Sequence, residues 1–507
     1  MSTPAPQPDA YARAVDRFTL AGKLSAAGMM LSWDGQTHMP RGGAWARGEE
    51  MAALTEVSAD LIGSRAAADE LEEAEAMAGA LEAPERADLH EMRRLWAHAA
   101  AAPKALQTAK ARISQNLQAI WVDARANNDF ASFAVPFAEL LVVIREIAAA
   151  KAEALGLTPY GAMIDEYDPG VGEAMIDPIF ADLARSLPPL IAEVRERQAR
   201  WPAPLLFGEV PVESQAALSR RLAAAVGHRS ENFRIDAAPH PFSVPHSPGD
   251  VRFTTRYDVT NPRFSILATL HEAGHAMYEF NLPREFAFHP AGLARGASMH
   301  ESQSLSLEML AGRSREFLTF LAPLMAETFG GDSAVWSVAN VHNAWRRLDN
   351  GFIRVEADEV SYPLHVIMRY RLERALIAGD LTVADIPAAW DELFEQLIGR
   401  TPPSLGQGCL QDIHWAAGLF GYFPNYAMGA VLAAQFFERA TADDPQILPA
   451  LARGDFAPYF AWVRPRIHER ASLTDFASLV ADATGQPLGP EPFKRHLRRR
   501  YLEEPQP

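Results

Sequence analysis

Apolar residues recur along most of this 507-residue chain at spacings of three and four, the pattern of helices with one buried face. The spacing predicts helices over five segments, which are 9–31, 44–62, 104–128, 136–155 and 304–327. Capping signals predict two further boundaries: Asp177-Pro178 is typical of a helix start, and Gly399 is typical of the end of a helix over 386–398. We therefore expect a predominantly helical, all-α protein.

Residues 251–257 break this pattern, because polar and apolar residues alternate there and place Arg252, Thr254 and Arg256 on one side. A period of two is typical of a strand. The preceding Ser-Pro-Gly-Asp sequence at 247–250 favours a type II turn. These features predict a small hairpin over 240–257. Its edge strand could pair with an extended peptide, although a hairpin that only packs against the protein fits the pattern equally well.

Shortly after this hairpin, residues 271–275 read His-Glu-Ala-Gly-His. On a helix, His271 and His275 lie one turn apart on the same face, so their imidazoles can bind one divalent metal ion, most often zinc. Glu272 then lies beside the metal, where it can take a proton from an activated water molecule. The arrangement indicates hydrolysis, most simply of a peptide bond. The alternative is a surface helix with two solvated histidines.

The flanks of the motif favour the metal site. Pro262 suits a first helical turn, because its missing N–H would have no partner there. Ile266, Leu267, Leu270 and Met277 make the helix strongly apolar, which predicts that it is buried. Two histidines inside a buried helix need partners, and a metal ion supplies them.

A catalytic zinc site needs a third protein ligand. The metzincin arrangement is excluded, because Tyr278 and Asn281 stand where it requires glycine and histidine. A carboxylate from a following helix is the other solution, and Glu301 and Glu308 are the candidates. For Glu301 a second interpretation stays open, since Ser298 and Glu301 have the spacing of a capping box, which needs no metal.

Two later segments also carry candidate chemistry. Arg354 and Asp358 are four residues apart, the spacing of an ordinary ion pair on a helix. Residues 408–415 bring Asp412, His414 and Trp415 together in a short stretch. A buried, hydrogen-bonded histidine explains His414 as well as a functional role does.

Composition narrows the class of protein. A hydrophobic content of 48% with 22% charged residues indicates a globular protein, and the net charge of −17 argues against nucleic acid or an anionic membrane as partner. Cys409 is the only cysteine, so neither an intramolecular disulfide nor a cysteine-rich zinc site can form. The sequence contains no recognisable signal peptide, membrane-spanning run, repeat or long linker. We expect a cytoplasmic protein with a single domain over residues 9–502.

Six short motifs, in this order, resemble the carboxypeptidase Taq family of metallocarboxypeptidases. They are His240-Pro241-Phe242, Asp250-x-Arg252-x-Thr254, His271-Glu272-x-x-His275, His300-Glu301-Ser302-Gln303, Ile353-Arg354-x-x-Ala357-Asp358 and Gly408-x-x-Gln411-Asp412-x-His414-Trp415. The resemblance implies a helical fold with a deep cleft, a homodimer, and release of single residues from the free C-termini of peptides with broad specificity.

The resemblance also implies roles for individual residues. His271, His275 and Glu301 would bind one zinc ion, and Glu272 would act as general base and then as general acid. Arg354 would bind the carboxylate of the substrate, with Asp358 orienting its guanidinium group. The remaining candidates for substrate or oxyanion contacts are His240, Arg252, His414, Tyr422 and Tyr426.

Other activities fit the same metal motif. An oligopeptide endopeptidase would use the same machinery without an anchor for the C-terminus, and an aminopeptidase would need an acidic anchor for the substrate amine. A helical peptide-binding protein held together by a metal, without turnover, is the third alternative. A site of two histidines and one glutamate also accepts cobalt or manganese.

Overall fold

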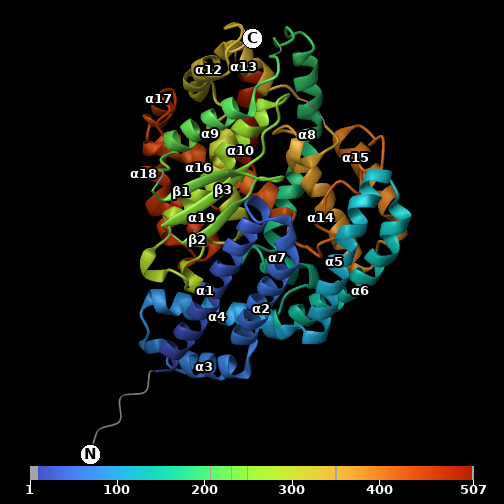
Figure 1. Ribbon diagram of the computed structural model, residues 1–507, viewed down its shortest axis with the longest axis vertical. Helices are drawn as coiled ribbons and strands as arrows, with labels where there is room; N and C mark the ends of the chain where they lie inside the picture. Colours follow the sequence, from blue (N-terminus) through green and yellow to red (C-terminus); the bar gives the residue numbers. More distant parts are fainter. Residues whose placement is uncertain (1–8, 206, 230, 248, 349–350, 505–507) are drawn as a thin grey trace, which may run out of the picture.

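The computed structural model describes residues 9–205, 207–229, 231–247, 249–348 and 351–504, and most of them are helical (Figure 1). The expected predominantly helical fold with a small sheet is therefore confirmed. Among the described residues, nine α-helices precede the sheet: α1 Ala10–Thr37, α2 Ala44–Gly63, α3 Arg65–Ala76, α4 Ala83–Ala101, α5 Lys104–Asn127, α6 Phe130–Leu155, α7 Pro159–Asp165, α8 Glu173–Gln198 and α9 Val212–Val226.

Four of the five segments predicted from apolar spacing are single helices, namely α1, α2, α5 and α6. The observed bounds differ from the predicted ones where a capping residue was not recognised in the sequence. Helix α6 begins six residues before the predicted 136, because the Asp129 side chain accepts a hydrogen bond from the backbone N–H of Ser132. The helix predicted to start at Asp177 begins at Glu173 instead and contains Pro178 in its interior, so that prediction was wrong.

The fifth segment, 304–327, is not one helix. Helix α11 ends at Leu305, a π-helical turn labelled η5 spans Ser306–Ala311, and α12 starts at Arg315. The Ser314 hydroxyl caps α12 by accepting a hydrogen bond from the N–H of Phe317. A π turn breaks hydrogen-bond periodicity without breaking the apolar spacing, which explains why the pattern concealed it.

The sheet has three strands, β1 Phe233–Ala237, β2 Ser243–Ser247 and β3 Asp250–Thr255, in the order β1-β3-β2. Strands β2 and β3 are antiparallel, which confirms the predicted hairpin. Pro248 of the predicted turn lies outside the described residues. Strand β1, which pairs parallel with β3, was not predicted. The sheet packs against α10, so it lies next to the helix with the histidine motif.

The remaining helices complete the protein around α10. They are α10 Pro262–Phe280, α11 Ala297–Leu305, α12 Arg315–Phe329, α13 Val338–Trp345, α14 Tyr362–Ala378, α15 Ile386–Ile398, α16 Pro424–Asp443, α17 Ile447–Leu451, α18 Ala457–Arg466, α19 Phe476–Thr484 and α20 Glu491–Arg498. Gly399 ends α15 with a φ of 77°, as predicted. Pro262 begins α10, also as predicted, and one side of this helix carries Ile266 and Leu270 into the core.

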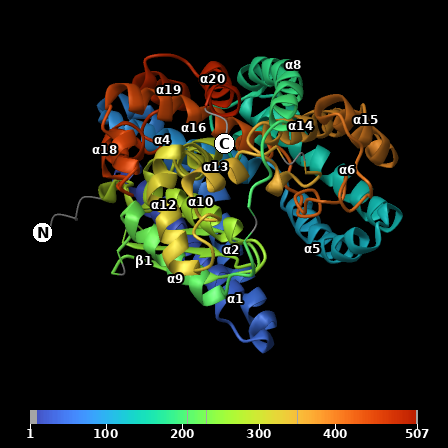
Figure 2. The same ribbon diagram turned by 90° about the horizontal axis from the view of Figure 1, so that it is seen from above.

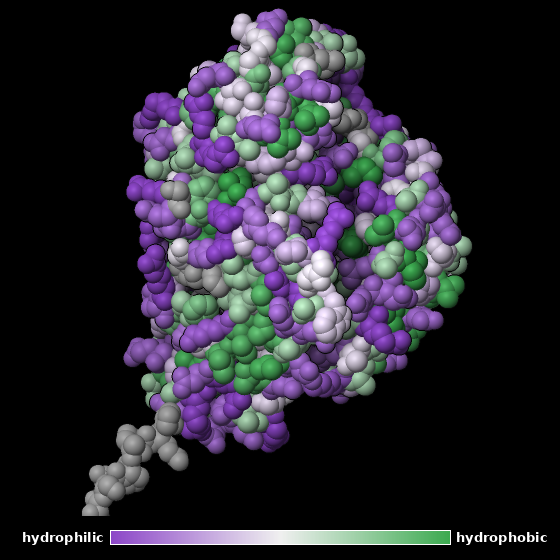
Figure 3. Space-filling view, in the orientation of Figure 1, coloured by the Kyte–Doolittle hydropathy of each residue, from purple (hydrophilic) through white to green (hydrophobic). Residues whose placement is uncertain are grey.

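Two views show how the chain is arranged. Helices α1–α4 form one end of the molecule, the sheet and α10 lie near its middle, and α5, α6 and α15 lie together on one side (Figures 1 and 2). Apolar side chains gather on the surface over α1 and α2 (Figure 3), helices that carry the exposed Leu20, Trp45 and Val57. Among the described residues, no helix is both long and apolar enough to cross a membrane.

Candidate active site

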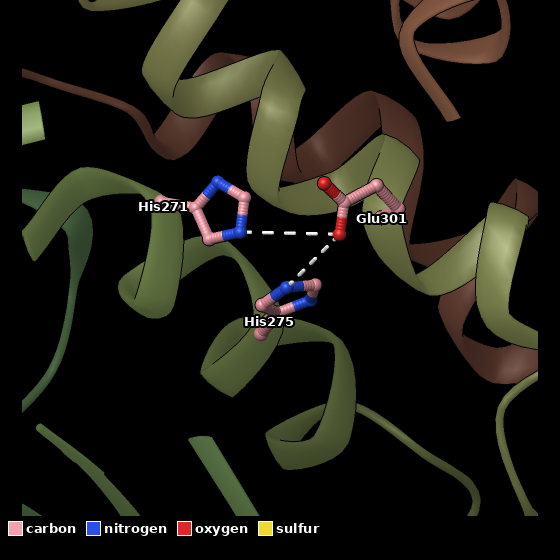
Figure 4. Close-up of side chains that lie close together, drawn as sticks. All are labelled: His271, His275 and Glu301. Atoms are coloured by element: carbon pink, nitrogen blue, oxygen red, sulfur yellow. Dashed lines mark ion pairs between the residues drawn. The ribbon is translucent and has the colours of Figure 1, made fainter. Parts of the chain in front are cut away.

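Helices α10 and α11 bring together the three residues expected to bind metal (Figure 4). His271 and His275 project from one face of α10, and Glu301 faces them from α11. Nε2 of His275 lies 3.6 Å from Oε2 of Glu301, and Nε2 of His271 lies 3.9 Å from the same oxygen. The three ligand atoms all lie within 4.8 Å of one another. Ligand atoms around a tetrahedral zinc are roughly 3.3–3.5 Å apart, given bonds of about 2.0–2.2 Å. The two distances to Glu301 are close to this spacing.

The ring nitrogens that point away from this centre are already occupied. Nδ1 of His271 lies 3.0 Å from the Glu308 carboxylate, which also binds Arg313 at 2.5 Å. Glu308 therefore supports His271, and Glu301 is the carboxylate whose oxygen faces both histidines. The contact also leaves Nε2 of His271 as the nitrogen directed at Glu301, which is the arrangement that metal-binding histidines usually have.

The electrostatics of the two histidines differ. Burial lowers the pKa of His275 to about 3, so its imidazole is neutral, the form that binds metals. Burial also acts to lower the pKa of His271, but Glu301, Glu308 and Glu272 outweigh it and raise the pKa to about 10. A metal ion must displace that proton, so we expect metal binding to release a proton.

Glu301 is not a capping residue. Helix α11 starts after Gly296, whose φ of 84° suits glycine, so Ser298 is already inside the helix and cannot be its N-cap. The backbone N–H of Ser298 donates to Asp168 instead. Between the two interpretations left open by the sequence, the geometry therefore excludes the capping box.

Glu272 is 5% exposed, and its carboxylate accepts a 2.9 Å hydrogen bond from the Ser243 hydroxyl on β2. Burial raises the pKa of Glu272 to about 7, although His271 and Ser243 act in the opposite direction. A carboxylate with a pKa near neutrality can both accept and return a proton.

These residues lie in the wall of a cavity of about 850 Å³. Tyr422 and Tyr426, at the start of α16, contribute to the same wall. An apolar part of the wall comes from α1, α2, α4 and the loop between α10 and α11, through Phe18, Met29, Ile62, Leu95, Phe288 and Leu293. Among the described residues that line the cavity, none is a lysine or an arginine.

Arg354 lies behind this wall, not in it. Its guanidinium carbon is 4.5 Å from the centre of the Tyr426 ring, and the residue is 4% exposed. Its nitrogens bind Asp412 at 3.0 Å, and Asp412 also binds Arg369. The predicted pairing with Asp358 was wrong, because the 3-10 turn η6 (Arg354–Glu356) ends before Asp358 can complete a helical turn. Asp358 instead accepts hydrogen bonds from the N–H groups of Val360 and Ser361.

The weaker candidates fall into two groups. His414 is partly buried, and its Nε2 lies 3.1 Å from the hydroxyl of Tyr426, a residue of the cavity wall. Burial lowers the pKa of His414 to about 4. His240 and Arg252 are not in the cavity wall: His240 is exposed, and Arg252 binds Asp250 and stacks on Trp33.

Sequence reasoning missed several residues of the site. Ser243 directly follows the motif 240–242, and only the fold shows that its hydroxyl reaches Glu272. The partner of Arg354 is Asp412, which is 58 residues away along the chain. His300 was quoted only as part of a motif, yet its ring lies against His275, with Nδ1 atoms 2.6 Å apart.

A helical chain in which two histidines and a glutamate converge beside a buried carboxyl group has the arrangement that a metal-dependent peptidase requires. The sequence model of the carboxypeptidase Taq (M32) metallopeptidases matches residues 15–501, and the chain belongs to this family. It is therefore a metallocarboxypeptidase, a peptide hydrolase that depends on a divalent metal ion.

Known carboxypeptidases match this chain in sequence and in structure along nearly its whole length. Thermostable carboxypeptidase 1 of Thermus thermophilus is 35% identical over 488 residues, which cover 94% of this chain and 95% of that protein. The structure of metallocarboxypeptidase 1 of Trypanosoma cruzi superposes with a TM-score of 0.94 at 36% identity, covering 97% and 99% of the two chains. The M32 carboxypeptidase of Deinococcus radiodurans gives a TM-score of 0.91 at 30% identity, with 97% and 99% covered.

Proposed function

We propose that this enzyme releases single amino acids of many kinds from the free C-termini of peptides, with Zn²⁺ held by His271, His275 and Glu301. The observation that carries the proposal is the convergence of these three ligand atoms within 4.8 Å in a cavity wall that also contains Glu272. Cobalt or manganese suits the same donor set.

When bound, the metal supplies Lewis-acid chemistry, lowering the pKa of water and polarising the scissile carbonyl group. Glu272 accepts the proton of the attacking water while its carboxylate is held by Ser243. It then delivers the proton to the leaving amine. Tyr422 and Tyr426 are the proposed hydrogen-bond donors to the oxyanion, and His414 fixes the hydroxyl of Tyr426.

Exopeptidase specificity requires a cation for the terminal carboxylate, and we assign this role to Arg354. Its guanidinium stacks on Tyr426, a residue of the cavity wall. Because Arg354 is buried and bound to Asp412, a carboxylate can reach it only when Tyr426 moves aside. His240 and Arg252 remain candidates for substrate contacts outside the cavity.

The test uses one peptide with a free C-terminus and the same peptide with an amidated C-terminus, each with and without added metal. We expect stepwise loss of C-terminal residues from the free peptide only, and only with metal. Internal cleavage of both peptides would instead indicate an endopeptidase. Metal binding without turnover of either peptide would indicate a binding protein, and shortening from the amino end would indicate an aminopeptidase.

The family resemblance supports a homodimer, and the sequence analysis supports a cytoplasmic location. We propose that residues 9–502 form one catalytic domain, that the enzyme is a cytoplasmic homodimer, and that it acts on peptides and binds neither nucleic acid nor a membrane. Sedimentation at micromolar protein concentration tests the dimer, and fractionation of the source cells tests the location.

A further inference from the structure

Behind His275, two side chains form a hydrogen-bonded chain that the proposed mechanism does not use. Nδ1 of His275 lies 2.6 Å from Nδ1 of His300, and Nε2 of His300 lies 2.8 Å from the Glu279 carboxylate. All three residues line the cavity, and the two imidazole rings are 4.5 Å apart.

The two helices place these groups by simple spacing. His271, His275 and Glu279 follow one another at intervals of four residues, so they lie on one face of α10. His300 directly precedes Glu301 on α11. Helix α11 therefore places Glu301 at the proposed metal centre and places His300 next to His275 of α10.

One arrangement of protons satisfies every contact in this chain. Two imidazole nitrogens 2.6 Å apart must share a single proton. If His275 uses Nε2 for the metal, its Nδ1 carries that proton and donates it to Nδ1 of His300. His300 then carries its own proton on Nε2 and donates it to Glu279.

The two histidines of α10 are thus supported in different ways. His271 is held directly by a carboxylate, Glu308, which is bound to Arg313. His275 is held by a second imidazole, and the carboxylate comes one step later. His300 can accept a hydrogen bond from His275 and donate one to Glu279 only in one tautomer. The orientation of His275 therefore depends on both His300 and Glu279.

We propose that His300 and Glu279 are positioning residues, which hold His275 in the tautomer and ring orientation that binds the metal. The inference rests on the proposed function, because it takes His275 as a ligand. It predicts that the affinity for the metal falls when the hydrogen bonds of His300 are removed, separately from any effect on the chemical step.

The test measures Zn²⁺ affinity by competition with a chelator and the visible spectrum of the cobalt-loaded full-length protein. His300→Leu keeps side-chain bulk but removes both contacts, and we expect affinity to fall about 10–100-fold, with an altered cobalt spectrum. His300→Asn places an amide oxygen near the position of Nδ1, so it should recover part of the affinity. Glu279→Gln, which keeps an acceptor but loses its charge, should cost less than His300→Leu.

Two controls separate the possible causes. His90→Leu removes an exposed histidine of α4 and should leave affinity and spectrum unchanged. Glu301→Ala should release the metal, and if it does not, the proposed metal site itself is wrong. If Glu301→Ala releases the metal while His300→Leu keeps the parental affinity and spectrum, only the positioning role is overturned. Parental affinity with lost turnover in His300→Leu would also overturn it.

Discussion

Glu272 combines two properties: it is almost fully buried, and its carboxylate accepts a hydrogen bond from a neutral hydroxyl and not from a cation. Burial disfavours the charged carboxylate, and a hydroxyl offsets this less than an arginine would. Glu308 shows the contrast. Its carboxylate lies 3.0 Å from His271 on the same helix, α10, but Arg313 and His271 outweigh its burial and lower its pKa to about 2.

For this reason Glu272 can exchange protons near neutral pH, whereas Glu308 stays ionised. We predict that Glu272→Gln keeps the metal and lowers kcat by at least about 100-fold. Metal content after dialysis and single-turnover rates provide the measurement. Ser243→Ala is the matched control, because it removes the hydroxyl but leaves the carboxyl group, and it should cost much less. Near-normal kcat in metal-loaded Glu272→Gln would rule out the proton-shuttle role.

Arg354 is the residue on which exopeptidase specificity depends in the proposed function. We predict that Arg354→Ala lowers kcat/KM for free-carboxylate peptides by about 100–1000-fold, since a charge-assisted contact is lost. Arg354→Lys should restore little, because an ammonium group lacks the planar fork that binds two oxygens. Residual cleavage of amidated peptides should not change.

The burial of Arg354 adds a second expected effect. Its removal takes one of the two arginines from Asp412 and leaves Arg369, so the variant should also be less stable, by about 1–3 kcal/mol. Assays therefore belong well below the melting temperature of the variant. Equal losses on free and amidated peptides, or a loss that only follows unfolding, would make Arg354 a structural residue.

At the scale of elements, the site depends on how closely α11 lies between α10 and α16. A Cβ atom at Gly274 of α10 would come within 2.5 Å of the Gln303 carbonyl oxygen, and one at Gly429 of α16 within 2.6 Å of Cβ of Glu301. Such distances force movement, because the contacts are with backbone or with the base of a side chain. The two glycines fix α11 from opposite sides, and with it the Glu301 carboxylate.

We predict that Gly429→Ala displaces Glu301 and weakens Zn²⁺ binding, with a loss of stability of about 1–3 kcal/mol from overpacking. Chelator competition and thermal unfolding measure the two effects. Gly48→Ala on α2 is the control, since a Cβ there meets nothing within 4 Å, and it should leave metal binding unchanged. If Gly429→Ala binds zinc as the parent does, close packing of α16 does not position the ligand.

Elements could be predicted from the sequence where local signals decide them. The apolar spacing located α1, α2, α5 and α6, and Pro262 marked the start of α10 correctly. The π turn η5 could not be found, because its stabilising partner is distant: Arg500 donates to the carbonyl oxygens of Met309 and Leu310. Strand β1 was missed because its partner β3 lies further along the chain and pairs parallel to it.

In the whole molecule, too, the sequence predicts what local geometry decides and does not predict contacts between distant segments. Residues 271–275 predicted that His271 and His275 lie on one face of a helix, because helical geometry alone brings them together. The apolar wall of the cavity comes from α1 and α2, more than 200 residues before the motif, and no local pattern relates them. The same holds for Arg354, whose ion pair with Asp412 depends on how the segment after α15 folds back.

Glu359 joins distant parts of the chain. Its carboxylate is fully buried and binds Arg500 at 2.5 Å and His496 at 3.0 Å, near the C-terminal end of the described residues. Arg500 in turn holds η5, which follows the ligand helix α11. Burial opposes ionisation of Glu359, but Arg500 and His496 outweigh it and lower its pKa to about 2.

Because the folded-state pKa of Glu359 lies below its ordinary value of 4.5, its contribution to stability is fully present above about pH 5 and is lost as the pH falls toward 2. A shift of this size corresponds to roughly 3 kcal/mol. We predict that Glu359→Gln has a much lower melting temperature at pH 7, and that the gap to the parent narrows from pH 5 to pH 3. Glu327→Gln, at an exposed ion pair with Arg221, should follow the parent at every pH. If the difference in melting temperature between Glu359→Gln and the parent stays constant with pH, the carboxyl group stabilises the fold through its shape and not through its ionisation.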